Sequence, residues 1–447
     1  MRTIQVSIVG CLMGVAALAA SNSPVTFNKD VLPVLQKNCQ ECHRPGEVTP
    51  MSLINYSDAR PWAKAIKAAV LAKKMPPWFA DPKYGHFANE RTLSEAEVNT
   101  LAAWADGGAV EGDAKDRPAP VTFPEGWQIK PDLIVEMPKP FAIPAKGTVN
   151  YKWIVVKTNF PQDLWVEAAE MRPGNSKVLH HGKVWVRPPG SHWMENAVPG
   201  EAYELETQAN VMGRNQMAEG NDILGKFNPG LGAQDFKIDG AAKFVPKGSD
   251  LVFEMHYTAS GQETSDVSKI GLVLAKNPPQ RRYFLATGPS ANNLIISPGD
   301  SNAEVVSEVT VGLDNVKLVY AQPHMHLRGK DMQLRAVYPN GETEIFLDSK
   351  WNFEWQLGYD FTEPVALPKG TRLIAISHFD NSANNPFNPD PQKEVWWGLQ
   401  NWEEMSNCFV GLTIDLKDNP DRLFRRTGPS LLRPVTGVSG PTLTALR

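Results

Sequence analysis

The 447-residue sequence predicts a mainly β protein, with two tandem antiparallel β-sandwich domains preceded by a small all-α domain. Short runs rich in Val, Ile, Leu and Trp, separated by Pro, Gly and Asn, recur from residue 132 onward. No long helical pattern alternates with these runs, and about 300 residues are enough for two sandwiches. Helical spacing is concentrated in the first 113 residues.

Residues 1–20 have the features of a secretory signal peptide. Arg2 precedes an apolar run that ends in Ala17-Leu18-Ala19, and the alternative is a lipoprotein cleavage site at Cys11. We therefore expect a periplasmic or secreted protein. No later stretch reaches the ~18 apolar residues of a membrane span. The formal net charge is -4 and there is no basic block, so nucleic acid is not an expected partner.

A haem-attachment motif lies in residues 21–113, at Cys39-Gln-Glu-Cys42-His43. The two thiols of such a motif form thioethers with haem, and the imidazole becomes an iron ligand. A zinc half-site is the alternative, but the sequence has no second cysteine pair. We therefore expect one covalently bound haem c.

The residues around this motif predict three helices. The first leads into the motif from Val31, and the second covers residues 62–74 until Pro76-Pro77 halts it. The third begins at a capping box, Ser94-x-x-Glu97, and stops at Gly107-Gly108. Three helices around one haem resemble a small class I cytochrome c.

Met75 is the candidate for the sixth iron ligand. Prolines follow it directly and would hold its thioether in an extended loop. The alternative is a core methionine beside Trp78. His86 could compete for the iron, but its favoured interpretation is a surface or propionate-side histidine. The choice among them stays open from the sequence.

The β-rich remainder divides into a linker at 114–130, a first sandwich at 131–288 and a second at 289–447. Asn340-Gly341 between two strand runs predicts a hairpin turn. Residues 195–240 interrupt the strand pattern, as either a lid or a surface excursion. The predicted strands cover residues 132–137, 151–158, 164–168, 178–186, 251–258, 270–274, 304–311, 316–321, 332–338, 344–348, 372–379 and 408–415.

Five histidines of the β-rich region are candidate metal ligands. His324 and His326 are two apart after a strand run, so they can project from one face and grip a metal; exposed strand histidines are the alternative. His180 and His181 are adjacent, so both can reach one ion only if the strand bulges there. His256 could complete that ion's shell. Imidazole alone does not select among copper, zinc and nickel, whereas the thioether of Met405 would favour Cu(I) at the His324-His326 site.

These residues resemble the copper type II, ascorbate-dependent monooxygenases, the family of the peptide-amidating and dopamine-hydroxylating enzymes. The similar motifs are Leu-His180-His181-Gly, Phe-Glu-Met-His256-Tyr, Pro-His324-Met-His326-Leu-Arg-Gly-Lys and Trp-Glu-Glu-Met405-Ser-Asn. The resemblance spans residues 130–420 and implies two jelly-roll sandwiches. It also implies an electron-transfer copper on the first three histidines, facing an oxygen-activating copper on His324, His326 and Met405 across a solvent-filled cleft.

Departures from the family concern the substrate. Gln322 and Phe409 replace an arginine and a tyrosine that hold the carboxylate in the peptide-amidating enzyme, so a glycine-extended peptide is not expected. The family's disulfide near the methionine cannot form because Ser406 follows Met405. Cys408 is expected to be a buried thiol. His378 is read as a packing histidine, with an extra ligand or acid/base group as the alternative, and His192 as an exposed one.

The sequence therefore predicts a monooxygenase with two copper ions and one haem c, which hydroxylates a small-molecule or peptide-like substrate with O2. An external donor would reduce the haem, and electrons would pass to the all-histidine copper and then to the second copper. The rivals are a haem and copper protein that relays electrons without catalysis, and a binding module with fortuitous histidines.

Overall fold

The computed structural model describes residues 24–45, 47, 49, 51–123, 126–204, 222–228 and 231–425. Strands dominate this part of the chain, and its α-helices all lie between residues 32 and 106, so the predicted mainly β class is confirmed. The expected signal peptide, residues 1–20, lies outside the described residues. None of the described helices has the length and apolar character that a membrane span requires.

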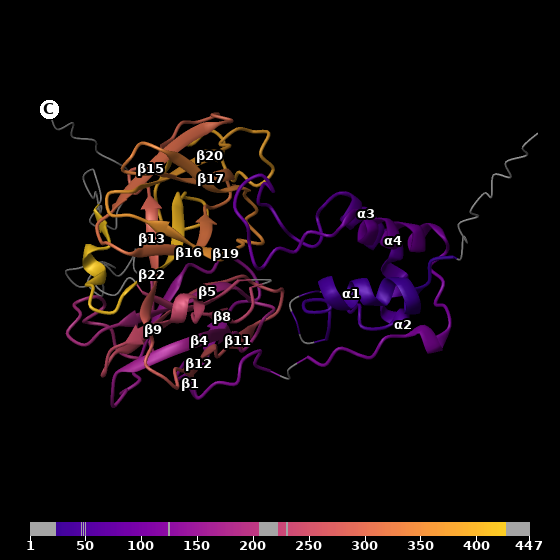
Figure 1. Cartoon of the computed structure of the whole chain (residues 1–447), viewed down its shortest axis with the longest axis horizontal. Coiled ribbons are helices and arrows are strands. Elements are labelled where there is room, and N and C mark those ends of the chain that lie inside the picture. The colour runs from indigo at the N-terminus through magenta and orange to yellow at the C-terminus, as the bar shows by residue number, and fades with distance from the viewer. Residues whose placement is uncertain are drawn as a thin grey trace, which may run out of the picture.

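Four short helices surround a small core of their own beside the β-rich body (Figure 1). The capping box at Ser94 forms as predicted, and Gly107 is the C-cap of the last helix. The second predicted helix ends early, because Lys73 takes a left-handed φ of 53°. Helices this short do not by themselves establish a cytochrome c class. Their bounds are α1 (Leu32–Asn38), α2 (Tyr56–Ala59), α3 (Ala63–Leu71) and α4 (Glu95–Asp106).

One nine-stranded sheet runs through the middle of the β-rich body, in the order β1-β12-β4-β9-β13-β22-β16-β19, with β8 beside β4. Its two halves meet where β9 and β13 pair in parallel. The two β regions therefore share a continuous sheet. The bounds are β1 (Leu133–Glu136), β4 (Leu164–Arg172), β8 (Gln234–Asp235), β9 (Ala241–Val245), β12 (Lys269–Leu274), β13 (Arg281–Ser290), β16 (Val316–His324), β19 (Tyr359–Leu367) and β22 (Asn407–Asp415).

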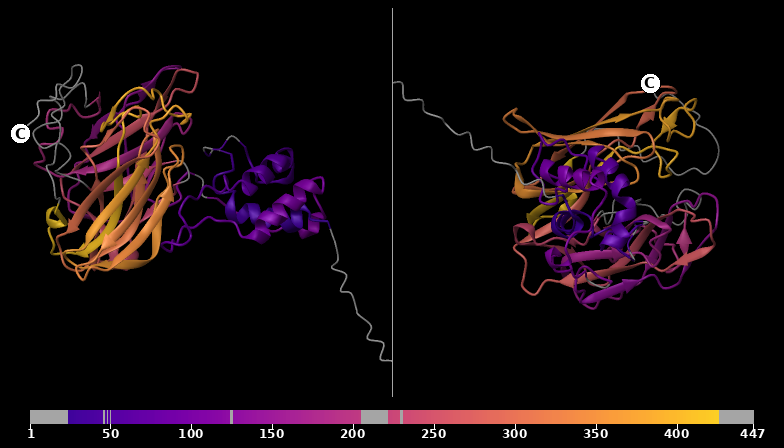
Figure 2. Two further views of the ribbon diagram at one scale, coloured as in Figure 1. Left: turned by 90° about the horizontal axis from the view of Figure 1, so that it is seen from above. Right: turned by 90° about the vertical axis from the view of Figure 1, so that its right-hand side faces the viewer.

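Each half of this sheet is covered by a five-stranded sheet, and a separate apolar core fills each sandwich. In the left view of Figure 2 the helices lie beside the β-rich body, and in the right view the second half of that body lies above the first. The first cover has the order β6-β3-β10-β5-β7 and the second β18-β17-β20-β15-β23. Their bounds are β3 (Lys152–Val156), β5 (Leu179–Arg187), β6 (Ala202–Tyr203), β7 (Ile223–Phe227), β10 (Asp250–Tyr257), β15 (Ala303–Val311), β17 (Gly329–Val337), β18 (Thr343–Lys350), β20 (Arg372–Phe379) and β23 (Phe424–Arg425).

Four remaining short strands form two small ladders, β2 (Phe141–Ile143) with β11 (Thr264–Asp266) and β14 (Ile295–Ile296) with β21 (Val395–Trp396). The predicted hairpin at Asn340-Gly341 joins β17 to β18, with Gly341 at a φ of 89°. Among the described strands of five or more residues, the sequence pattern missed β7, β9, β13 and β19. β19 contains Pro364, which an edge strand tolerates, and it is the last strand of the nine-stranded sheet.

Residues 78–91, which we call the strap, leave the helical region and pack on the second sandwich. Ala80 bridges to Ser349 at the end of β18, and Phe87 bridges to Phe361 in β19. Both strap residues belong to the core of the second sandwich. The sequence boundary implied that residues 21–113 form a self-contained unit. The strap shows instead that part of this region belongs to the second sandwich.

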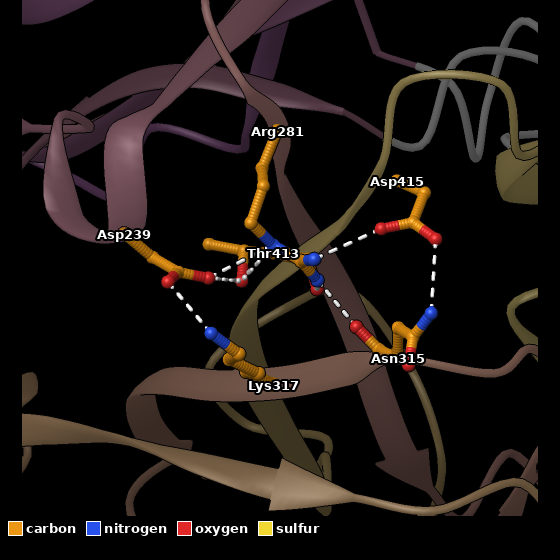
Figure 3. A network of polar contacts seen from close by, with 6 residues as sticks. All are labelled: Asp239, Arg281, Asn315, Lys317, Thr413 and Asp415. Atoms are coloured by element: carbon orange, nitrogen blue, oxygen red, sulfur yellow. Dashed lines mark hydrogen bonds and ion pairs between the residues drawn. The ribbon is translucent and has the colours of Figure 1, made fainter.

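A polar network ties the two sandwiches together at one end of the shared sheet (Figure 3). The Arg281 guanidinium in β13 lies 2.8 Å from the Asp239 carboxylate and 2.9 Å from that of Asp415. Asp239 also accepts from Lys317 at 2.7 Å and from the Thr413 hydroxyl at 2.9 Å. These contacts join the turn Ile238–Gly240 of the first sandwich to β16 and β22 of the second.

Candidate metal centre

A β-bulge places the two adjacent histidines of β5 on the same side of the strand. His181 pairs with His256 in β10, and Leu179 pairs with Tyr257, so His180 between them has no partner in the ladder. Such a bulge re-aims one side chain. The bulge or twist that the sequence required for both histidines to reach one ion is present as a bulge.

The three imidazoles of this first set face one another through their Nδ1 atoms. Nδ1 of His181 lies 3.0 Å from that of His180 and 3.4 Å from that of His256. Nitrogens bound to one tetrahedral ion at ~2.0 Å would lie about 3.3 Å apart. The three nitrogens therefore fit one metal ion.

The opposite ring nitrogens of this set have partners of their own. The Tyr151 hydroxyl lies 2.7 Å from Nε2 of His181, and Nδ2 of Asn401 lies 2.9 Å from Nε2 of His256. A metal on Nδ1 leaves the proton on Nε2. With the Asn401 amide turned by 180°, its oxygen, which has no partner among the described residues, would accept that proton from His256. Asn401 comes from the second sandwich, so both sandwiches hold this set.

The second pair of histidines uses the opposite nitrogens. His324 is the last residue of β16, and its Nδ1 lies 3.1 Å from Oε1 of Gln356. Nδ1 of His326 lies 3.2 Å from the carbonyl oxygen of Glu403. Nε2 of His326 is buried without a partner among the described residues. A donated Nδ1 proton leaves Nε2 as the atom available to a metal.

A buried carboxylate connects this pair to Met405. The carboxylate of Glu404 accepts from the backbone N–H of His326 at 2.8 Å and of Arg328 at 2.6 Å. Burial raises the pKa of Glu404 to about 8, and these N–H groups oppose the rise. Met405 follows directly, and its sulfur accepts from Nδ2 of Asn407 at 3.4 Å. Asn407 pairs with His324 across the sheet, so the methionine is anchored near His324, and its chain neighbour Glu404 is bonded to His326.

The two histidine sets are adjacent. The ring centroids of His181 and His324 lie 6.4 Å apart, and both residues are buried. The expectation of a solvent-filled cleft between the sets is therefore wrong for this structure. The separation is small because residues of both sandwiches pack into one core beside the shared sheet, among them Phe409, whose ring centroid lies 5.8 Å from that of His324.

Burial keeps these imidazoles neutral. It lowers the pKa of both His180 and His326 to about 4, and it lowers that of His181, His256 and His324 as well. Neutral imidazole is the form that binds a metal. The site can thus accept an ion at neutral pH without first losing protons.

The haem-attachment motif follows α1 in a single turn, where the His43 N–H donates to the Cys39 carbonyl at 2.9 Å. Neither Cys39 nor Cys42 is in a disulfide, and Nδ1 of His43 is buried without a partner among the described residues. Burial raises the pKa of the Cys42 thiol, and the nearby Arg91 guanidinium opposes that rise. Free thiols beside a half-buried imidazole fit covalent haem attachment. Met75 is half-buried in the segment after α3.

Two lysines that the sequence analysis did not single out lie at the boundary between the sandwiches. The buried Lys226 ammonium donates to the Tyr320 hydroxyl at 2.6 Å and to Oε1 of Gln322. The Lys183 ammonium lies 5.0 Å from the ring centroid of Phe409. Lys183 is two residues from His181 in the same strand, so the two side chains lie on one strand face. This spacing is the one sequence signal that could have identified Lys183 as a residue near the site.

The remaining singled-out residues lie outside the two sets. His378 bonds Asp331 at 2.6 Å, His192 lies 2.8 Å from Glu195, and His86 is exposed. These positions fit the packing and surface roles expected of them. Cys408 is a buried thiol, as expected, and burial raises its pKa to about 12. The interval 195–240 contributes β7 to the first sandwich, so it is partly built into a sheet; residues 205–221 lie outside the described residues.

A scan against protein-family models and a search of curated proteins found no match. Among solved structures, the major capsid protein P2 from bacteriophage PM2 is 10% identical, with a TM-score of 0.28 over 64% of this chain and 98% of its own. STIV MCP is 9% identical, with a TM-score of 0.30 over 64% and 97%. PNGF-II is 10% identical, with a TM-score of 0.29 over 64% and 65%. Likenesses this weak say nothing about function.

Proposed function

We propose that this protein is a periplasmic or secreted copper-dependent monooxygenase that hydroxylates an organic substrate with O2 and receives electrons through a covalent haem c. The observation that carries this proposal is that five buried or half-buried histidines from both sandwiches converge. In the first set, the Nδ1 atoms of His180, His181 and His256 face one another. In the second set, Nε2 of His326 has no partner among the described residues. Met405, anchored beside the second set, adds the soft ligand that favours copper.

The proposal assigns each ligand set its own role. His180, His181 and His256 would hold an electron-transfer copper, and His324, His326 and Met405 would hold the copper at which O2 reacts. Two copper ions and one haem would supply one-electron chemistry. Under this proposal the sandwiches are jelly rolls and the helical region is a cytochrome c domain that attaches haem through Cys39, Cys42 and His43, with Met75 as the sixth ligand.

The chain's own residues would orient and protect these groups. Gln356 and the Glu403 carbonyl fix the tautomers of His324 and His326, and Glu404 fixes the backbone at His326 and Arg328. Gln322 is uncharged and its side-chain oxygen accepts from Lys226, so it does not replace the arginine that holds the substrate carboxylate in the peptide-amidating enzyme. This supports a substrate other than a glycine-extended peptide. The substrate would be a small molecule or peptide-like, and an external donor would reduce the haem.

The test is copper reconstitution of the haem-loaded mature protein. We expect two copper ions per chain, O2 uptake, haem reoxidation and a mass gain of one oxygen atom in a susceptible substrate. The measurements are metal analysis, oxygen electrode traces and mass spectrometry across candidate substrates.

Met405→Ile is the informative variant, because it removes the thioether and retains an apolar side chain of similar size. O2-coupled product formation should be lost. If this variant forms product as the wild type does, Met405 is not part of the O2 site; fewer than two coppers per chain in the wild type would refute the broader proposal.

A second candidate is a haem and copper protein that relays electrons without turning over a substrate. The close, buried packing of His181 against His324 favours it, because little space is left for a substrate between the sets. The two functions differ in one result. A relay would show haem and copper redox changes with no oxygenated product from any substrate.

A further inference from the structure

The strap is bonded along its length to the second sandwich. Lys350 N–H donates to the Phe79 carbonyl at 3.1 Å, and Thr362 N–H donates to the His86 carbonyl at 2.9 Å. Nδ2 of Asn89 donates to the Gly358 carbonyl at 2.9 Å, while Asp360 N–H donates to Oδ1 of Asn89 at 3.0 Å. These bonds hold the helical region, with its haem-attachment motif, against β18 and β19.

The first residue of the strap connects the candidate haem ligand to this contact. Trp78 follows Met75 by three residues and packs edge-on against Tyr359, with ring centroids 5.0 Å apart. Trp78 and Arg91 also line a small cavity at the strap. Arg91 ends the strap three residues before Ser94, the N-cap of α4, so the cavity lies where the strap returns to the helical region.

The opposite wall of the cavity leads to the metal ligands. It is formed by residues 355–358, and Gln356 both lines the cavity and lies 3.1 Å from Nδ1 of His324. The same loop offers a rival path, because Phe353 stacks on His180 with ring centroids 5.2 Å apart. Phe353 is not among the cavity-lining residues, whereas Gln356 is.

We infer that the strap delivers the haem electron directly to the His324-His326-Met405 site, through Trp78 and Gln356, and not first to the all-histidine site. This inference rests on the proposed function. It changes the order of electron transfer expected from the sequence, in which the all-histidine copper receives the electron before the second copper. One electron leaves ferrous haem, which becomes ferric, and reduces Cu(II) to Cu(I). No atom or proton is transferred. Trp78 and Gln356 are positioning residues in this account.

The test uses the full haem-loaded chain without O2 or substrate. Reduced haem is mixed with Cu(II), haem oxidation is followed by stopped-flow absorbance, and loss of the Cu(II) signal is followed by electron paramagnetic resonance. In a His180→Ala, His256→Ala double variant, which lacks the first site, we expect one electron to reach the remaining copper within about threefold of the wild-type rate.

Path variants separate the two routes. Trp78→Leu and Gln356→Leu should each slow haem oxidation on the order of tenfold or more, whereas Phe353→Leu should change it by less than about threefold. Gln356→Glu, which keeps an acceptor for His324, should restore the fast rate. Copper content and haem reduction potential are measured in every variant, so that a lost metal or a shifted potential is not mistaken for a lost path.

Slow transfer in the double variant, or slowing by Phe353→Leu and not by Gln356→Leu, would overturn the inference and support entry through the all-histidine site. Failure of the proposed function itself looks different. In that case the wild type would contain no haem or fewer than two coppers before any rate is measured.

Discussion

Four of the five candidate histidines have one ring nitrogen bonded to a residue outside the two sets, which leaves the other nitrogen for an ion. Which nitrogen is left determines how each set could bind a metal. In His324 and His326 the occupied atom is Nδ1, whereas in His181 and His256 it is Nε2. Outer partners of this kind fix the tautomer and raise ligand basicity. Glu404 accepts from the backbone N–H of His326 and directly precedes Met405, so a change at Glu404 reaches two candidate ligands.

Glu404→Gln is predicted to weaken copper binding at the second site by about 10- to 100-fold. The amide retains one acceptor, but its NH2 group then faces a backbone N–H of His326 or Arg328 that needs an acceptor. Competition with a Cu(I) chelator measures the change.

Glu170→Gln is the matched control for this variant. Glu170 is also a buried carboxylate, and it accepts from the backbone N–H groups of Gln128 at 2.6 Å and Ile129 at 3.1 Å. It should leave copper affinity unchanged. An equal loss of affinity in both variants would mean that Glu404 affects only general stability.

The sequence identified the candidate ligands at the residue scale but not their partners. His324 and His326 are recognisable because their spacing matches a strand face. Gln356, Tyr151 and Asn401 come from distant segments that carry no local pattern. Only the folded contact between the two sandwiches brings Asn401 to His256.

At the scale of elements, a bulge and a strap position the chemistry. The need for the bulge at His180 followed from strand geometry alone, since neighbouring strand residues otherwise point apart. The strap had no such signal, because residues 78–91 lack both helical and strand periodicity. Its place is set by tertiary contacts of Trp78 and Phe87 with the second core.

Phe87→Ala is predicted to lower the free energy of unfolding by about 3 kcal/mol. The buried ring contacts Tyr359 and Phe361, with both centroid distances at 5.2 Å, and its removal leaves a cavity under the strap. Urea unfolding measures the loss, and proteolysis should cut the strap sooner. Phe387→Ala is the control, because Phe387 is 62% exposed; similar losses in both variants would show that the strap is not docked.

At the scale of the whole molecule, the two sandwiches form one body. They share the nine-stranded sheet, and Val319, Tyr320 and Phe409 from the second half pack into the core of the first. The sequence predicted two sandwiches with the right strands in most places, but it placed a boundary at residue 288. That boundary falls inside β13, which pairs with β9 of one half and β22 of the other.

Arg281→Ala is predicted to destabilise the protein by on the order of 3 kcal/mol within a single unfolding transition. It leaves the carboxylates of Asp239 and Asp415 without their shared guanidinium at the junction shown in Figure 3. Arg372→Ala is the control, because its pair with Glu308 is largely exposed and should contribute less than about 1 kcal/mol. Two resolved transitions in calorimetry would contradict the single-body description.

The most direct test of the central claim is copper X-ray absorption on the reduced, copper-loaded protein, combined with metal analysis. The account predicts two coppers per chain, with imidazole ligands and one sulfur shell that disappears in Met405→Ile. A sulfur shell that persists in that variant, or the absence of sulfur from the wild-type spectrum, would contradict a copper site built from His324, His326 and Met405.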